Sequence, residues 1–260
     1  MSIRNLNLKK SGYSTITIPK KVREIIIDGI KHGIKTRFNS IYKKKNNLKS
    51  FSSIDKSIMK LKDNEFQNAF GNNLFRYLRP ETTKEINKWI TKIPGKFNSK
   101  MSSLHYPRTQ DLKKFKNLSS DQFVGYFRCV RSNKNDVTYP HRDIDFWNLE
   151  LKKNLFLSPF KQKKMFKVWI PISGCGVKNS LRLIKDSNKK KINIKYVLKN
   201  NNLKPKIPEE FIIKNNHLIV QPIKNFHKQG LIFDNKSVHF APINNQKKTR
   251  ISVEFTVFTK

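Results

Sequence analysis

The sequence predicts an α+β fold in which helices support a sheet of short strands. Two patterns indicate this class. Apolar residues recur at helical spacing over much of the first 120 residues, and from Gln122 onward they gather in short runs separated by turn-rich connectors. A block of helices followed by a block of strands is typical of α+β proteins. A length of 260 residues and a hydrophobic content of 37% suffice for one full core, so we expect a single domain over 1–260.

The helical part, 1–120, opens on a strand and then alternates helices with polar connectors. GYSTITI at 12–18 is β-branched and alternating, which predicts the strand. The elements expected after it are, in order, a helix from Pro19 through KKVREIIIDGIKHGI, a polar loop at 42–53, a helix at 54–78 that breaks near Gly71 and stops before Pro80, a helix at 82–93 capped by Thr82 or Thr83, and a polar loop to Ser120.

The second part, 121–260, is built from strand-like runs. They are QFVGYFRCVR, MFKVWIPI, SLRLI, HLIVQPI, GLIFD and RISVEFTVF. Lys/Asn-rich connectors lie between them, notably at 185–202, which we expect to be a loop. Many short strands with turn-rich connectors favour a sandwich or a barrel.

The formal net charge of +37 suggests a nucleic-acid partner. Lysine outnumbers arginine 44 to 11, however, and is spread over the whole chain. Nucleic-acid surfaces favour arginine, whose guanidinium makes paired contacts to phosphates and bases. We therefore interpret the charge as composition carried on solvated faces. A nucleic-acid partner is the less favoured hypothesis, although anionic substrates would still be attracted at low salt.

The sequence also predicts the cellular compartment of the protein. The first residues lack the apolar core of a signal peptide, and no run approaches the roughly 18 apolar residues that a membrane helix needs. Cys129 and Cys175 are too few for a disulfide framework or a cysteine-based zinc site. We expect a cytoplasmic protein with two reduced thiols and no membrane partner.

Three residues form a candidate metal site. The run PHRDIDFW places His141 and Asp143 two residues apart, and SVHFAP supplies His239. Residues two apart in an extended segment point to one face, so His141 and Asp143 can direct two ligands at one ion from a strand end. His239 would come from a strand that folds alongside, as strands do in a jelly roll. Two imidazoles and a carboxylate are the ligands of non-haem Fe(II) oxygenases, which leave metal positions open.

The last strand-like run, TRISVEFTVF, alternates cleanly between two faces. Ile251, Val253 and Phe255 fall on one face, and Arg250 and Ser252 fall on the other. A buried arginine needs a partner. The far carboxylate of a bound 2-oxo acid would give Arg250 a paired ionic contact, to which Ser252 adds a hydrogen bond.

The order His-x-Asp, distant His, Arg-x-Ser resembles that of the Fe(II)/2-oxoglutarate-dependent dioxygenases. The similarity is greatest to the phytanoyl-CoA dioxygenase-like superfamily, including its members that tailor sugars and antibiotics. GYSTITI is similar to the opening strand of that superfamily, and KVWIPISG with NSLRLIKDS is similar to its W-x-P-L … S-L-x-x-I-P-G-S-H region. The chain departs from the pattern at 185–188, where KDSN stands in place of P-G-S-H. The resemblance covers most of the chain and is strongest over 125–258.

The resemblance implies a double-stranded β-helix, a cupin-like jelly roll, over 121–260 with the N-terminal helices as a buttress. It implies that His141, Asp143 and His239 hold Fe(II), that Arg250 and Ser252 hold the co-substrate 2-oxoglutarate, and that O2 is the oxidant. The implied reaction is hydroxylation of a C–H bond of a small molecule, with a carbohydrate or a secondary metabolite as candidates, and with release of succinate and CO2.

Four further residues are weaker candidates for substrate contacts. Asp145 and Trp147 follow the alternation of the first two ligands and would line the mouth of the site. Arg128 and Arg131 lie on the strand before those ligands and would meet an anionic substrate or the 2-oxo acid.

Alternatives remain open at this point. The same chemistry could act on a nucleic acid or a protein, and desaturation or epimerisation could replace hydroxylation. A jelly-roll binding module without iron is disfavoured by the intact ligand set. A cupin-like isomerase or zinc protein is disfavoured by Arg250 and Ser252. A halogenase is disfavoured by Asp143, because a halide needs that ligand position vacant.

Overall fold

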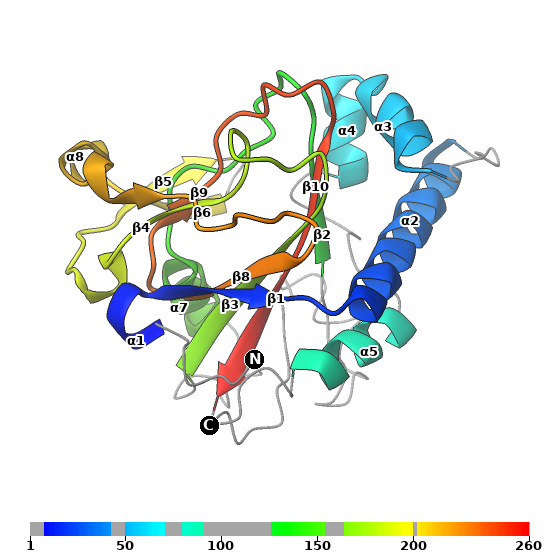
Figure 1. Ribbon diagram of the computed structural model, residues 1–260. Helices are drawn as coiled ribbons and strands as arrows, with labels where there is room; N and C mark the ends of the chain where they lie inside the picture. The colour runs from blue at the N-terminus through cyan, green and yellow to red at the C-terminus, as the bar shows by residue number, and fades with distance from the viewer. Residues whose placement is uncertain are drawn as a thin grey trace.

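The computed structural model describes residues 8–42, 50–70, 80–90, 126–153, 164–199 and 202–259. Within these ranges, the helices of residues 20–90 stand together on one side of a group of antiparallel sheets (Figure 1). The predicted break near Gly71, the end of the helix at Ile93, the polar loop to Ser120 and the start of QFVGYFRCVR lie outside the described residues. Both cysteines are free thiols, and Cys129 is buried.

The larger sheet has five antiparallel strands in the order β1-β8-β3-β10-β2. These strands are β1 (Tyr13–Thr17), β8 (Gln229–Asp234), β3 (Lys164–Ser173), β10 (Arg250–Thr259) and β2 (Tyr126–Val130). The predicted first strand is thereby confirmed, and it pairs with a strand more than 200 residues later in the chain. In the middle of the sheet, Ser252 lies opposite Arg128 on one side and Pro171 on the other, next to a register shift.

A smaller sheet faces part of the larger one. It contains β7 (Ile219–Val220), β4 (Arg182–Ile184) and β9 (His239–Phe240), in that order. One apolar cluster joins the two sheets: Trp169, Leu231 and Phe233 come from the larger sheet, and Leu183 comes from the smaller. Burial of these side chains holds the two sheets together. His141 extends the smaller sheet through a single antiparallel bridge to His239.

The helices pack on the other face of the larger sheet. They are α2 (Lys20–Tyr42), α3 (Phe51–Met59), α4 (Asp63–Phe70) and α5 (Pro80–Ile90), preceded by the short α1 (Leu8–Ser11). Ile26, Ile30 and Ile34 are fully buried along α2 at helical spacing, and they belong to the same apolar cluster as Phe127 of β2 and Val253 of β10. Helices and sheet therefore share one core (Figure 1).

Helix boundaries differ from the expected ones where side chains cap the backbone. The oxygen of the Ser50 side chain accepts a hydrogen bond from the Ser53 N–H at 3.2 Å, so α3 begins inside the predicted loop. The next break falls between Met59 and Asp63, well before Gly71. Helix α5 begins at Pro80 itself, because the first helical position tolerates proline's missing N–H. Thr82 is therefore not the cap.

The predicted loop at 185–202 is wrong in part. It contains a 3-10 turn, η3 (Ser187–Lys189), and the strand β5 (Lys195–Lys199), which pairs with β6 (Asn202–Lys206) as a hairpin. The lysines at the ends of β5 hid the apolar run between them. Conversely, most of HLIVQPI is not a strand, because a 3-10 turn, η4 (Asn216–Leu218), precedes the two residues of β7. Helix α8 (Glu209–Lys214) lies between β6 and η4.

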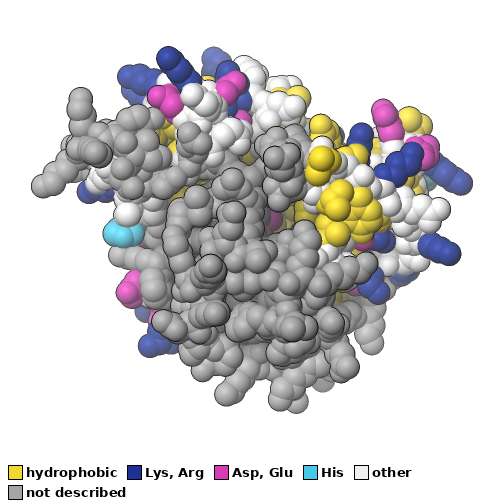
Figure 2. Space-filling view, turned by 180° about the vertical axis from the view of Figure 1, so that it is seen from behind, with side chains coloured by type: hydrophobic (Ala, Val, Ile, Leu, Met, Phe, Trp, Pro, Cys, Tyr) yellow, Lys and Arg dark blue, Asp and Glu magenta, His cyan; other side chains and the backbone are white. Residues whose placement is uncertain are grey.

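The positive charge is distributed over the described surface. Figure 2 shows Lys and Arg side chains at several separate places on the rear face, with hydrophobic side chains exposed beside them on one side. The β5–β6 hairpin contributes the exposed pair Leu198 and Leu203, which lie opposite each other. None of the described helices combines the length and apolar content that a membrane crossing requires.

Candidate metal and 2-oxo acid site

The structure brings His141, Asp143 and His239 together. Their ligand atoms all lie within 4.8 Å of one another. Asp143 Oδ1 is 4.0 Å from His141 Nε2, and Asp143 Oδ2 is 3.7 Å from His239 Nε2. Metal–nitrogen bonds of about 2.1 Å place adjacent ligands about 3 Å apart. The three side chains would therefore draw together by roughly 1 Å around a single ion.

Backbone contacts orient both imidazole rings. His141 Nδ1 is 2.7 Å from the Tyr139 carbonyl oxygen, and His239 Nδ1 is 3.0 Å from that of Ser237. A carbonyl accepts only from a protonated nitrogen, so each Nδ1 carries the hydrogen and each Nε2 presents its lone pair toward Asp143. Burial and the neighbouring His239 lower the pKa of His141 to about 3, which keeps the ring neutral and able to bind a metal.

The chain supplies the first two ligands from a strand–helix junction and not from one extended strand. His141 makes its bridge to β9, and α7 (Asp143–Lys153) begins two residues later. The expected alternation therefore ends at Asp143, which lies in the first turn of the helix. Helical geometry directs Asp145 and Trp147 away from the position that a strand would give them. Both are buried, but neither lines the pocket next to the histidines.

Asp143 is suited to receive a cation. Its Oδ2 atom is buried and makes no hydrogen bond in the described structure. The ammonium of Lys167 on β3 lies 3.5 Å from this oxygen and 3.4 Å from the Thr256 hydroxyl. Lys167 is only 2% exposed. Sequence reasoning missed this residue, although a lysine inside the otherwise apolar run MFKVWIPI was the signal that could have identified it.

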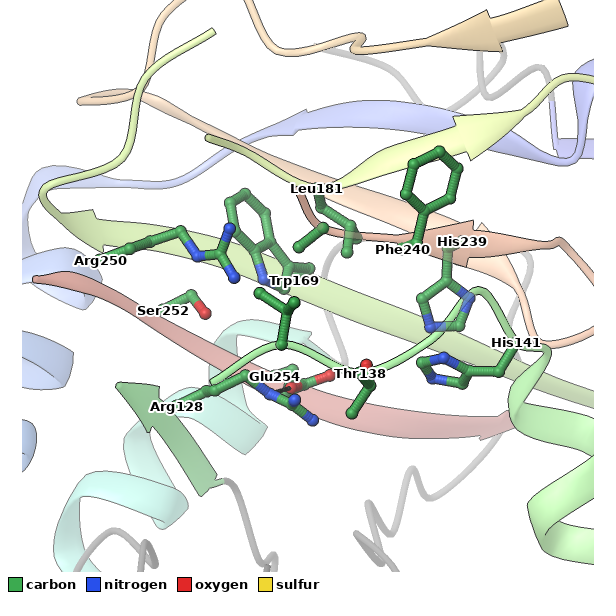
Figure 3. Close-up of a pocket in the computed structure, with 12 residues that line it drawn as sticks. Arg128, Thr138, His141, Trp169, Leu181, His239, Phe240, Arg250, Ser252 and Glu254 are labelled. Atoms are coloured by element: carbon green, nitrogen blue, oxygen red, sulfur yellow. Dashed lines mark hydrogen bonds and ion pairs between the residues drawn. The ribbon is translucent and has the colours of Figure 1, made fainter. Parts of the chain in front are cut away.

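A narrow pocket joins the histidines to the start of β10. Figure 3 shows His141 and His239 at one end and Arg250 and Ser252 at the other, with Trp169 between them. The remaining lining residues are Arg128, Val137, Thr138, Leu181, Phe240, Ala241 and Glu254. The open space at its centre is about 30 Å³. This is room for no more than a few water molecules, so a larger ligand needs the lining to move apart.

Arg250 is a buried cation that lacks an acidic partner among the described residues. It is 2% exposed, and its Nη1 donates to the backbone carbonyls of Asn179 and, at 3.4 Å, Pro242. Burial lowers the pKa of Arg250 to about 10, so the guanidinium is still charged at neutral pH. Ser252, 1% exposed, lines the pocket beside it. A buried charge is costly unless paired, so this end of the pocket favours a carboxylate ligand.

An internal ion pair forms the floor of the same pocket. Arg128 Nε donates to Glu254 Oε1 at 3.0 Å. Burial alone would raise the pKa of Glu254, but the charges of Arg128 and Lys167 lower it to about 2. Arg128 thus lies at the pocket, as one of the two arginines expected there.

Arg131 lies elsewhere and has structural partners. Its guanidinium donates to both oxygens of Asp136 at 2.9 Å and to the Leu61 carbonyl at 3.0 Å, and it pairs with Asp63 at 3.0 Å. These contacts join β2 to the helical layer, because Asp63 and Leu61 lie at the start of α4. We expected Arg131 on the strand before the metal ligands, but β2 ends one residue earlier, at Val130, and the Arg131 side chain does not line the pocket.

Sequence comparison gives no match to a protein family or to a curated protein. Solved structures are similar to the chain along nearly all of its length. EctD from S. alaskensis with 2-oxoglutarate and 5-hydroxyectoine is 10% identical, with a TM-score of 0.57 over 97% of this chain and 73% of that one. EctD with bound Fe gives 0.52 at the same identity, over 97% and 74%.

The chain has the fold of EctD. AviO1 from Streptomyces viridochromogenes Tue57 shares it at 9% identity, with a TM-score of 0.50 over 100% of this chain and 93% of that one. The resemblance drawn from the sequence is thereby confirmed at the level of the fold: antiparallel sheets with added helices in an EctD-like arrangement.

Proposed function

We propose that the chain is a non-haem Fe(II)- and 2-oxoglutarate-dependent oxygenase that hydroxylates a C–H bond of a small molecule. One observation carries the proposal. His141, Asp143 and His239, which are buried or nearly so, converge on one point, and the pocket that the two histidines line ends at a buried arginine without an acidic partner among the described residues. The first group suits a divalent metal, and the second suits a carboxylate. EctD, which shares the fold, binds Fe and 2-oxoglutarate.

Each residue has a distinct task in this proposal. His141, Asp143 and His239 hold Fe(II), and Arg250 with Ser252 holds the far carboxylate of 2-oxoglutarate. Bound iron supplies the oxidising chemistry, in which O2 gives one oxygen atom to succinate, formed with loss of CO2, and one to the substrate. The carbonyls of Tyr139 and Ser237 keep the histidines in the metal-binding tautomer. Binding of 2-oxoglutarate would release Arg250 from its carbonyl contacts in favour of the charged partner.

We further propose that the strand part, 121–260, is a double-stranded β-helix and that 1–260 is one domain buttressed by the helices of 1–120. Two antiparallel sheets with an apolar cluster between them support the jelly roll. The apolar cluster that contains both α2 and β10 supports the single domain, because neither part buries its own face without the other.

The lining favours a small molecule as the prime substrate. Val137 and Thr138 lie outside helices and strands, so they are the part of the wall that can move apart most easily. The Arg128–Glu254 pair offers both charges at the floor, and Phe240 with Leu181 offers apolar contacts. A carbohydrate or an anionic metabolite fits this mixture better than a purely apolar compound.

An anaerobic titration tests the proposal. Fe(II) and then 2-oxoglutarate are added to the metal-free protein, and the visible charge-transfer band of a chelated 2-oxo acid is recorded. The wild type should give the band, and Asp143→Ala should not. Absence of the band in wild type with iron bound would overturn the assignment.

Arg250→Ala should retain Fe(II) and weaken 2-oxoglutarate by at least about 100-fold, because losing one partner of a buried ion pair costs roughly 3–5 kcal/mol. Arg182→Ala is the control, since Arg182 lies on β4 but does not line the pocket. Equal affinity in Arg250→Ala and the control would remove Arg250 from the site.

A further inference from the structure

A second, open cavity lies beside the segment that carries His141 and Asp143, and Arg142 and Ile144 of that segment line it. Its volume is about 430 Å³, within the range of small-molecule sites, and none of its lining residues lines the metal pocket. Three separate segments form it: the start of α7, the loop through η3, and the turn after β8. The loop is the one in which the chain departs from the P-G-S-H pattern.

The lining is strongly basic. Lys and Arg make up five of the nine residues that line this cavity. They are Arg142, Lys189, Lys190, Lys191 and Lys236.

The acid in the lining is already neutralised. Asp145 is 3% exposed and receives two hydrogen bonds from the Arg142 guanidinium, at 2.7 and 2.8 Å. Lys189 pairs with Asp186, and Lys190 donates to the Asn215 side chain. Among the described residues, Lys191 and Lys236 form no ion pair, and both are exposed. Two free ammonium groups thus face one cavity from different segments.

The loop that carries three of the lysines is held in a fixed shape. The Ser187 hydroxyl donates to the Ile184 carbonyl at 2.6 Å and accepts from the Val238 N–H at 2.9 Å. Asp186 adopts a left-handed backbone, φ 60°, which turns the chain into η3. A site whose cations are already positioned loses less entropy when a ligand binds.

We propose that this cavity binds the diphosphate group of a small molecule. Ammonium groups from two segments, the η3 loop and the turn after β8, suit an anion with more than one charged centre, because one carboxylate cannot contact them all. Lysine binds phosphate as a point charge without a fixed geometry. The volume leaves room for an organic group beyond the phosphates. The site does not depend on iron or 2-oxoglutarate.

Calorimetric titration of the full-length, metal-free protein with pyrophosphate tests this assignment. EDTA is present and ionic strength is held constant, since both metal binding and salt would otherwise change the apparent affinity. Wild type should bind one pyrophosphate saturably. The double variant Lys191→Gln, Lys236→Gln should bind at least about tenfold more weakly, from the loss of two charged contacts.

Lys224→Gln with Lys228→Gln is the matched control, because both lysines are exposed, lie outside the cavity and remove the same net charge. It should change affinity less than about twofold, as an unspecific charge effect would. Equal weakening in both double variants, or no saturable binding, would overturn the proposal. The proposal would also be overturned if the double variant bound a single-stranded oligonucleotide more weakly than wild type does, while its affinity for pyrophosphate stayed unchanged.

Discussion

Lys167 brings a positive charge into the interior between two acids. Its ammonium is 3.5 Å from Asp143 Oδ2, and its charge helps to lower the pKa of Glu254. In the metal-free protein it is therefore the cation that balances the empty ligand carboxylate. A bound divalent ion would share that task.

Lys167→Met should lower the free energy of unfolding of the metal-free protein by about 3–5 kcal/mol, because it leaves a buried carboxylate without a counter-charge. Added Mn(II) or Co(II) should stabilise this variant more than wild type, since the metal supplies the missing charge. Urea unfolding with and without metal measures both effects. A metal-induced gain no larger than that of wild type, or of the exposed control Lys178→Met, would contradict this account.

Glu254 makes stability depend on pH in acid. Its pKa is about 2 when folded, against 4.5 for the ordinary group. The unfolded chain therefore takes up a proton first, and the stabilisation is complete above pH 4.5 and is lost as the pH falls toward 2. Glu254→Gln should cost about 3 kcal/mol at pH 7. In urea unfolding curves, the difference in free energy of unfolding between wild type and Glu254→Gln should be less than about half as large at pH 3 as at pH 7. A difference that stays constant with pH would show that Glu254 is not held ionised.

At the scale of elements, the turn after β3 fixes the start of β10. Gly174 has φ +63°, and a Cβ built there would lie 2.2 Å from the Thr249 carbonyl oxygen. Arg250, the first residue of β10, follows Thr249 directly. The close approach of the Gly174 and Thr249 backbones therefore fixes where the Arg250 side chain enters the pocket. Only glycine permits it.

Gly174→Ala should reduce the free energy of unfolding by at least about 2 kcal/mol, through left-handed strain and the clash with Thr249. It should also weaken 2-oxoglutarate, because Arg250 is displaced. Gly176→Ala is the control, since the nearest atom to its added Cβ is 3.9 Å away. Urea unfolding and the 2-oxoglutarate titration measure the two effects, and similar behaviour of both variants would refute the role of the turn.

Individual elements also differ in how well the sequence predicts them. The alternation of TRISVEF was sufficient to place Arg250 and Ser252 together on one side of a strand, because a strand repeats every two residues and both faces here are buried. The alternation of HRDIDFW was misleading, because Asp143 opens a helix and the pattern changes period there. Lys167 and the Arg128–Glu254 pair depend on which strands are neighbours, which the order of residues does not reveal.

At the scale of the whole molecule, the helical layer stabilises a sheet that holds the site. Ile30 of α2 is fully buried in the cluster that includes Val253, whereas the metal pocket has no lining residue from α2–α5. Stability and ligand binding should therefore separate when this layer is altered.

Ile30→Ala should lower the free energy of unfolding by about 2–5 kcal/mol, as a cavity in a packed core does. The affinity of the folded fraction for Fe(II) should stay within about twofold of wild type, because no ligand moves. Ile25→Ala, at a half-buried position on the same helix, should destabilise less. Loss of metal affinity in Ile30→Ala under conditions where it is folded would show that the helices position the site directly.

The position of β10 in the larger sheet determines when that sheet can close during synthesis of the chain. This strand lies between β3 and β2, and it is the one described strand with which β2 pairs. A nascent chain that has emerged only as far as Asn245 already has both histidines outside the ribosome, but the edges of β3 and β2 are still unpaired and Arg250 is still in the exit tunnel. The larger sheet can therefore close only after residues 250–259 have left the exit tunnel, and until then its unpaired strand edges are available to a chaperone.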